Sequence, residues 1–209
     1  MWYFTWILGV LLACAFGIIN VLWLEAQEAL DQESIILDPL TRLPTRVRFL
    51  EVLENRIGDY KTDQIPFSVM FISMDAFQKL SEKEDNEHVN NMAMTIAEVI
   101  KKNIRLPHDF ISRYDAATYT VILPGATANI AKTIAERICE NTVEQTKLPT
   151  NDSIISIGVA EYPALIGDNI DDSIQEQVTI LLEETDKACK NAQKQEKNSC
   201  CCANEIILS

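Results

Sequence analysis

The residues of this chain that could do chemistry are few and widely spaced. Asp75 closes an apolar run that begins at Phe67, and it stands without a second carboxylate at metal-ligand spacing. We interpret it as the polar end of a strand. The only two histidines, His88 and His108, have no ligand partner at suitable spacing, and we expect both on the surface. No nucleophile–base pair and no phosphate-binding glycine loop occurs in the sequence.

The six cysteines also give no clear site. Cys14 lies in a hydrophobic N-terminal stretch, Cys139 and Cys189 lie in helical patterns, and Cys200 to Cys202 are consecutive. Without paired spacing a disulfide framework is not expected, and a reducing compartment fits better. The consecutive cysteines could bind metal or be modified, but they lack the second ligand pair of a zinc site. We interpret residues 194–209 as a disordered tail.

Charge and length narrow the class of protein. The chain has 209 residues, a formal charge of −13 and a sequence pI near 4.6. Nucleic-acid binding through a basic face is therefore not expected. Beyond the hydrophobic N-terminal stretch there is room for one domain of about 150 residues.

The first 24 residues carry no charged side chain, and about 20 apolar residues suffice to cross a bilayer as a helix. Such a segment could be a signal peptide, a plain anchor or a subunit of a larger assembly. The absence of a basic residue before Arg42 and of a small-residue cleavage site argues against a signal peptide. The first basic residues follow the segment, which predicts a periplasmic N-terminus and a cytoplasmic C-terminal domain.

One face of this predicted helix carries small residues. Gly9, Ala13 and Gly17 recur every four residues, and Asn20 lies a further turn along, near the same face. Small residues at this spacing let another helix approach closely in lipid, and an amide there needs a partner. The pattern favours a packed subunit helix over a plain anchor.

From Met1 to Glu25 the chain resembles the small single-helix accessory subunit of bacterial cytochrome bd quinol oxidase. The resemblance runs through MWYF, WILG, LLAC, FG and LE. It implies an inner-membrane helix that packs on the haem-bearing subunit, with the second large subunit and membrane lipid as further partners. This chain alone would bind no cofactor or metal, and haems b and d are expected in the partner subunit. The predicted contact residues are Trp6, Gly9, Ala13, Gly17, Asn20 and Glu25.

After a connector over residues 26–37, hydrophobic periodicity predicts alternating helices and strands. Helices are expected around 46–57, 89–100, 130–138 and 174–193, and strands around 67–75, 109–114, 119–123 and 153–160. The order is a helix, then β-α-β-β-α-β, then a helix. It predicts an α+β domain over residues 38–193, with helices packed against an antiparallel sheet.

Residues 38–193 resemble the GGDEF domain of diguanylate cyclases. The residues 38–46, DPLTRLPTR, are similar to the family's D-x-L-T-G-L-x-N-R opening, and 156–160 read SIGVA as the family does. The resemblance implies a nucleotide-cyclase-like fold, in which a D-x-D pair and an acidic loop residue hold metal ions beside GTP. Here the D-x-D pair falls at Ser73 and Asp75, and the acidic loop residue falls at Ala117. The whole signature loop reads Asp115, Ala116, Ala117, Thr118 and Tyr119.

The departures from the family pattern affect every ligand group. Serine and alanine replace metal-binding carboxylates at positions 73 and 117, and the loop glycines are missing. Base and phosphate positions are Ser81, Asn90 and Gln78. The product-binding R-x-x-D motif is out of register. Asp109 is present, but Leu106 stands at the position of the arginine, and Arg105 is one residue away from it. We therefore predict a degenerate domain, a pseudo-enzyme without diguanylate cyclase activity.

These observations give a leading hypothesis and an alternative. The leading hypothesis is a non-catalytic accessory subunit of cytochrome bd oxidase, in the aerobic respiratory chain. Its GGDEF-like domain would be a cap or protein-interaction module, with self-association possible. The alternative is a membrane-anchored signalling pseudo-enzyme that binds a guanine nucleotide or a partner protein.

Overall fold

The computed structural model describes residues 2–75, 86–146, 154–164, 173–195 and 199–203, without the side chains of 2, 5, 10, 23–36 and 86. The chain divides into two compact units, Met1–Leu37 and Asp38–Ser209. Each unit is described by itself below.

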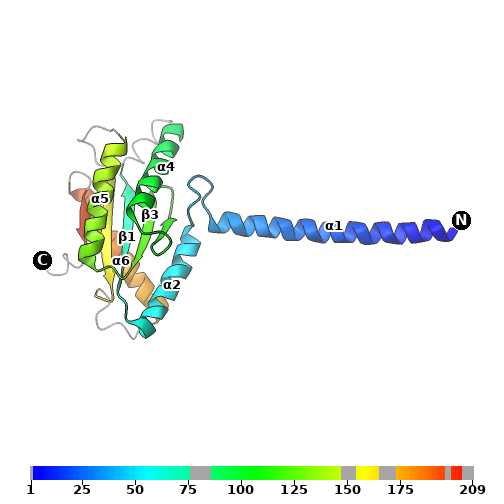
Figure 1. The fold of residues 1–209 in the computed structure, drawn as a ribbon, viewed down its shortest axis with the longest axis horizontal. Coiled ribbons are helices and arrows are strands. Elements are labelled where there is room, and N and C mark those ends of the chain that lie inside the picture. The colour runs from blue at the N-terminus through cyan, green and yellow to red at the C-terminus, as the bar shows by residue number, and fades with distance from the viewer. Residues whose placement is uncertain (1, 76–85, 147–153, 165–172, 196–198, 204–209) are drawn as a thin grey trace. The chain divides into compact units, whose positions relative to one another are not determined.

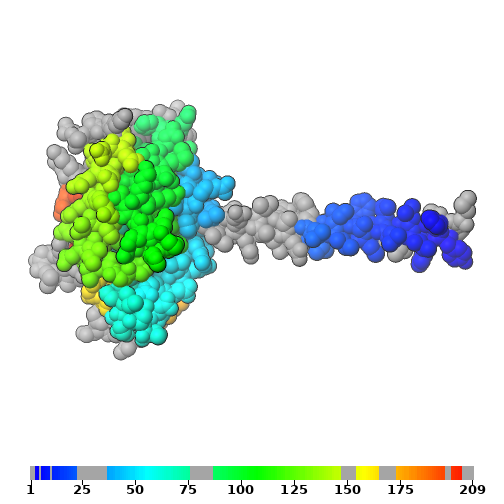
Figure 2. Space-filling model, viewed as in Figure 1, coloured from blue at the N-terminus to red at the C-terminus, as the bar shows by residue number. Residues whose placement is uncertain are grey.

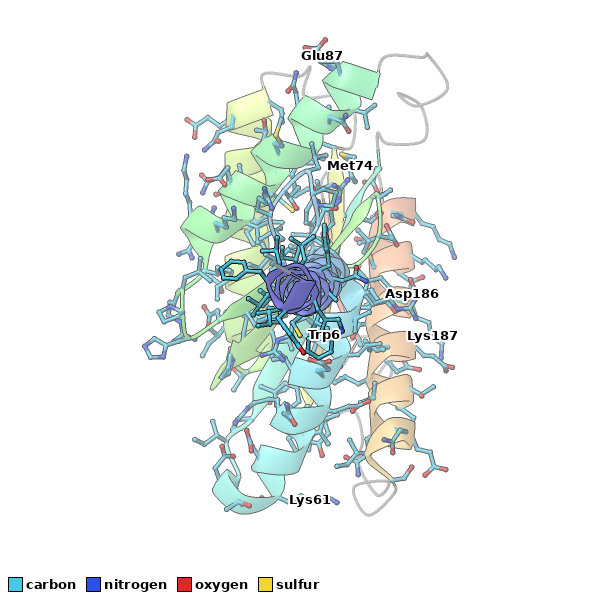
Figure 3. The ribbon with its side chains drawn as sticks, turned by 90° about the vertical axis from the view of Figure 1, so that its right-hand side faces the viewer. Trp6, Lys61, Met74, Glu87, Asp186 and Lys187 are labelled. Carbon is cyan, nitrogen blue, oxygen red and sulfur yellow. The ribbon has the colours of Figure 1, made fainter. Side chains whose placement is uncertain are left out.

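The first unit is one long helix, α1, which spans Trp2–Ile36 and so continues through most of the predicted connector. All of its described side chains are exposed, Trp6 among them at 67% (Figure 3). Across the described ranges, the structure holds no helix with both the length and the apolar character that crossing a membrane requires. The transmembrane span in our fold prediction therefore has no support from the structure.

The second unit is built on a five-stranded sheet with the order β2-β3-β1-β4-β5 (Figure 1). Strands β1, β2, β3 and β4 pair antiparallel, and β5 pairs parallel to β4. The strands are β1 (Phe67–Met74), β2 (Phe110–Arg113), β3 (Thr118–Pro124), β4 (Ile155–Tyr162) and β5 (Cys200–Cys202).

Two helices cover each face of this sheet. Helices α4 (Asn86–Asn103) and α5 (Ala128–Thr146) lie side by side over one face, where Figure 2 shows a continuous layer. Helices α2 (Arg46–Asp63) and α6 (Ile174–Lys194) cover the other. Because both faces are covered, β1 is apolar on both sides: alternate residues enter two separate cores. The α+β domain that we predicted is confirmed.

Helix α6 packs closely against β4 at Gly158. A Cβ atom placed there would lie 2.3 Å from the backbone nitrogen of Cys189 and 2.4 Å from the carbonyl oxygen of Thr185. Only glycine allows the helix backbone to approach the strand this closely. At its N-terminus α6 is fixed by a capping box between Ser173 and Glu176.

The prediction of a disordered tail over 194–209 is wrong for Cys200–Cys202, which form the edge strand β5. The pairing with Ile157, Gly158 and Val159 supplies the backbone partners, and Cys201 and Cys202 are buried. Residues 196–198 and 204–209 lie outside the described residues. A run of identical residues shows no alternation of polarity, so periodicity gave no sign of a strand.

Candidate functional site

The sequence-predicted site lies around the hairpin that joins β2 to β3. The Tyr114 amide donates to the carbonyl oxygen of Thr118 over 2.8 Å, which closes the turn. Inside it, a carboxylate oxygen of Asp115 accepts a hydrogen bond of 2.8 Å from the Ala117 amide. This bond to the amide two residues further on is an Asx turn, which aspartate side chains commonly form. Asp115 therefore shapes the loop.

An ion pair holds the base of the hairpin to the start of the domain. Arg113 Nη1 lies 3.0 Å from Asp38 Oδ2, and the two side chains are only 10% and 18% exposed. Arg113 Nη2 also donates to the carbonyl oxygen of Ala116 over 2.9 Å. The loop at 115–117 is thus tied through one guanidinium to residue 38.

Asp38 also organises the turn that follows it. Its Oδ2 accepts hydrogen bonds from the Thr41 amide (2.7 Å) and hydroxyl (2.8 Å). Burial alone would raise the pKa of Asp38, but the hydrogen bonds from Thr41 and the Arg113 guanidinium outweigh it and lower that pKa below 3.8. Within this turn Arg42 has a φ of +56°, at the position where the family motif has glycine.

The end of β1 reaches the same loop. Ser73 pairs with Thr118 in the sheet register, and the Met74 amide donates to the carbonyl oxygen of Ala117 over 2.8 Å. Met74 marks this end of the strand in Figure 3. The structure therefore brings together the predicted positions 73, 75 and 115–119.

Partners from distant elements hold both polar side chains at the end of β1. The Ser156 hydroxyl on β4 donates to Asp75 Oδ2 over 2.6 Å. Gln193 Nε2 on α6 donates to the Ser73 hydroxyl oxygen over 2.9 Å. The sequence did not predict these contacts of Ser156 and Gln193, because only the sheet register and the packing of α6 bring the two residues near the end of β1.

Tyr119, the last residue of the signature, is a core residue. It is fully buried, and its hydroxyl donates to the carbonyl oxygen of Ala93 on α4 over 2.8 Å. Burial raises the pKa of Tyr119 to about 12. A phenol held in this way supports the packing of α4 on the sheet and does not face a substrate.

The described residues do not fit a two-metal centre at this site. Asp75 is the one carboxylate at the positions that the resemblance assigns to metal ligands, and two metal ions need several shared oxygen ligands. No three His, Cys, Asp or Glu side chains in the described ranges are grouped so that they could hold a metal ion. Of the predicted base and phosphate positions, Asn90 is exposed on α4, whereas Gln78 and Ser81 lie outside the described residues.

Arg105 and Asp109, which sequence reasoning treated as an out-of-register remnant, are bonded to each other. The Asp109 side chain is fully buried, and its carboxylate accepts from the Arg105 amide (2.6 Å), Nε (3.2 Å) and Nη2 (2.9 Å). The sequence shows that the two residues are four positions apart, but it does not show the turn that brings their side chains together. The exposed Arg105 side chain therefore stabilises this turn by bonding to Asp109.

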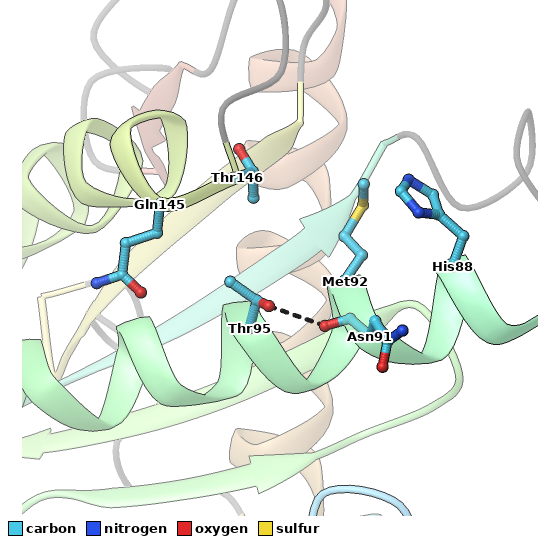
Figure 4. A pocket seen from close by; sticks show the side chains of 6 residues that line it. All are labelled: His88, Asn91, Met92, Thr95, Gln145 and Thr146. Carbon is cyan, nitrogen blue, oxygen red and sulfur yellow. Dashed lines mark hydrogen bonds between the residues drawn. The ribbon is translucent and has the colours of Figure 1, made fainter.

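A shallow pocket of about 150 Å³ lies between the first half of α4 and the end of α5 (Figure 4). Asn91 on α4 accepts a hydrogen bond of 2.8 Å at its carbonyl oxygen from Thr95. The pocket is lined by His88, Asn91, Met92, Thr95, Gln145 and Thr146. Both histidines of the chain are exposed, as we predicted.

The fold and the hairpin define an α+β domain of the nucleotide-cyclase type. A family-wide comparison matches residues 35–199 to the family described as "Diguanylate cyclase, GGDEF domain", and the chain belongs to that family. A solved structure of the coiled coil and GGDEF domain of DgcB from Caulobacter crescentus, in complex with c-di-GMP, superposes with a TM-score of 0.70. It is 19% identical, and the match covers 90% of this chain and 96% of that one.

Among curated proteins, the probable diguanylate cyclase DgcT of Escherichia coli is 28% identical over 145 residues, which are 69% of this chain and 27% of that protein. The chain spans only about a quarter or less of the cyclases it matches.

The N-terminal segment matches a second family. Residues 1–27 match the description "Membrane bound YbgT-like protein". Subunit X of the cytochrome bd-I ubiquinol oxidase of E. coli is 66% identical over 29 residues, which cover 14% of this chain and 78% of that subunit. Both resemblances that we drew from the sequence are therefore confirmed.

One prediction is overturned by these comparisons. We predicted that the chain is not an enzyme and lacks diguanylate cyclase activity, because its metal, base, phosphate and product positions all depart from the family pattern. The family and its relatives are diguanylate cyclases, so the comparisons point to a cyclase fold and not to a non-enzyme. Departures at individual ligand positions were too narrow a basis for that prediction.

Proposed function

We propose that this chain is an accessory subunit of a cytochrome bd quinol oxidase that brings a GGDEF-family domain to the complex. The observation that carries the proposal is the 66% identity over 29 residues to subunit X. That match covers 78% of the small subunit, so the N-terminal helix is related to most of an oxidase subunit.

The surface of α1 supports a packed role. Its apolar side chains are half or more exposed, and a Cβ at Gly9 or Gly17 would meet no atom within 4 Å. We place this helix in the inner membrane, with the N-terminus in the periplasm, against the haem-bearing subunit that holds haems b and d. The proposed contacts are Trp6, Gly9, Ala13, Gly17 and Asn20, and Glu25, whose side chain lies outside the described residues.

Copurification in mild detergent tests the proposal. A tagged full-length chain is expected to bring down haems b and d, measured by reduced-minus-oxidised spectra. The double variant Gly9→Leu with Gly17→Leu is expected to lower haem recovery at least tenfold, because added side chains separate the two helices. Ala15→Leu adds comparable bulk on the opposite side of the helix and is the matched control. Clean solubilisation without haem would refute the proposal.

A second candidate is a membrane-anchored signalling protein whose domain acts on a guanine nucleotide. The likeness to a GGDEF domain solved with c-di-GMP favours it. The full chain is incubated with GTP and Mg²⁺, and the products are separated by mass spectrometry. The double variant Ser73→Asp with Ala117→Glu is expected to raise turnover at least tenfold, because it adds two carboxylates beside Asp75. Equal turnover in the variant and the unaltered chain would count against this candidate.

A further inference from the structure

Three of the cysteines form the strand β5, and Cys139 and Cys189 lie in the two cores that this strand faces. In a strand alternate side chains face opposite ways, so Cys200 and Cys202 face one core and Cys201 the other. Cys139 on α5 is buried in the first of these cores, against which Cys200 also packs. Helix α5 contacts β5 directly.

Cys139 and Cys200 belong to one core but differ in their exposure. Burial is the main cause that raises the pKa of the Cys139 thiol to about 12, and the neighbouring Cys200 is the second. Cys139 is 5% exposed, whereas Cys200 is only partly buried. The two thiols therefore differ in access while they share one core. All six cysteines lie in the described residues, and none is in a disulfide.

We propose that Cys139 and Cys200 are a redox-active thiol pair, which hydrogen peroxide converts to a disulfide linking α5 to the edge strand β5. The proposal does not depend on the oxidase partnership. Its geometric basis is the shared core and the direct packing of α5 on β5. Forming the bond requires the two Cβ atoms to come within about 4 Å of each other. An edge strand of three residues can adjust its position more readily than a central strand.

The chemistry assigns a different role to each sulfur. The more accessible Cys200 attacks as thiolate, so a sulfur–oxygen bond forms, the O–O bond of peroxide breaks, and one oxygen leaves as water after protonation. The sulfur of Cys139 then displaces the hydroxyl of this sulfenic acid, losing its proton as a second water forms. Two thiols have lost two electrons, and one peroxide has become two waters.

A buried thiol on the other face provides a control. Cys189 on α6 faces the second core and its Sγ lies 3.5 Å from the carbonyl oxygen of Ser156. Burial raises the pKa of Cys189 to about 12, as it does for Cys139. Cys189 is thus matched in burial and protonation but lies on the wrong side of the sheet to reach Cys200.

Peptide mapping of the full chain tests the pair. The chain in mild detergent is treated with one equivalent of hydrogen peroxide, alkylated and digested with trypsin. We expect a disulfide between the peptides 138–147 and 198–209, and a fall in alkylated cysteines from six to four. Cys139→Ala or Cys200→Ser should abolish that cross-link, whereas Cys202→Ser and Cys189→Ala should leave it.

Two results would overturn the proposal. One is six alkylated cysteines after peroxide treatment of the unaltered chain. The other is an undiminished cross-link in Cys200→Ser, which would assign the bond to a neighbouring cysteine. Because Cys202→Ser changes the same strand and keeps the pair, it separates loss of folding from loss of the reacting thiol.

Discussion

Glycine has opposite surroundings in helix α1 and in strand β4. In α1 a side chain added at Gly9 or Gly17 would meet no atom within 4 Å, whereas at Gly158 it would run into the backbone of α6. The packing of the domain thus explains Gly158 completely. Within the described residues nothing requires the two glycines of α1. The contrast separates a glycine that the packing of the domain requires from two that it does not.

The largest effect is expected where the contrast is sharpest. Gly158→Ala should lower the free energy of unfolding by about 3 kcal/mol, because the helix backbone must retreat from the strand. Urea titration followed by circular dichroism measures this loss. Gly58→Ala is the control, since that site has open space and alanine favours the helix. Equal stability of the Gly158→Ala variant and the unaltered chain would mean that α6 packs farther from β4 than described.

The ion pair at the start of the domain should give the next effect. Asp38→Asn removes the charge that Arg113 and Thr41 stabilise, and we expect a loss of about 2 kcal/mol at neutral pH. Because the folded pKa of Asp38 lies below its ordinary value of 3.8, its contribution is complete above that value and is lost as pH falls through the lower folded pKa. Stability curves of the two proteins should therefore converge in acid, and a constant gap down to pH 2 would contradict the assignment.

A gain in stability is expected at Arg42, where the family motif has glycine. Arg42 adopts a left-handed conformation that costs a residue with a side chain about 1 kcal/mol, so Arg42→Gly should raise stability by that order. The same urea titration detects it. Arg48→Gly, in the regular part of α2, is the counterpart and should lower stability.

The smallest effect on the stability of the domain is expected from a substitution in α1. Gly17→Ala should leave the urea midpoint of the domain unchanged within error, because no atom of the described chain lies near the new methyl group. The comparison with Gly158→Ala uses the same substitution in both regions. A shift of the domain midpoint would show that α1 contributes to its folding.

Much of this fold could be predicted because its signals are local. Phe49, Leu53 and Ile57 recur every four residues and are buried on one face of α2, and the hairpin around 115–118 follows from two short apolar runs. The family itself could also be recognised, since blocks of family sequence lie in the right order.

What sequence could not supply depends on contacts between distant segments. The hydrogen bond between Ser156 and Asp75 joins residues 81 positions apart, and only the β1–β4 register reveals it. The strand β5 has no periodic pattern, so its three cysteines looked like a tail. The prediction of activity failed for a different reason, because departures at individual ligand positions were given more weight than membership of the family as a whole.

The Asp38–Arg113 ion pair links two backbone segments that are far apart in the sequence. Asp38 is the first residue of the domain, and the Arg113 guanidinium bonds both to it and to the carbonyl oxygen of Ala116 in the signature loop. The Arg113 amide also donates to the carbonyl oxygen of Pro44 over 2.8 Å. Replacing the Arg113 side chain would therefore remove a partner from the opening turn of the domain and from the signature loop at once, while this backbone link to β2 would remain.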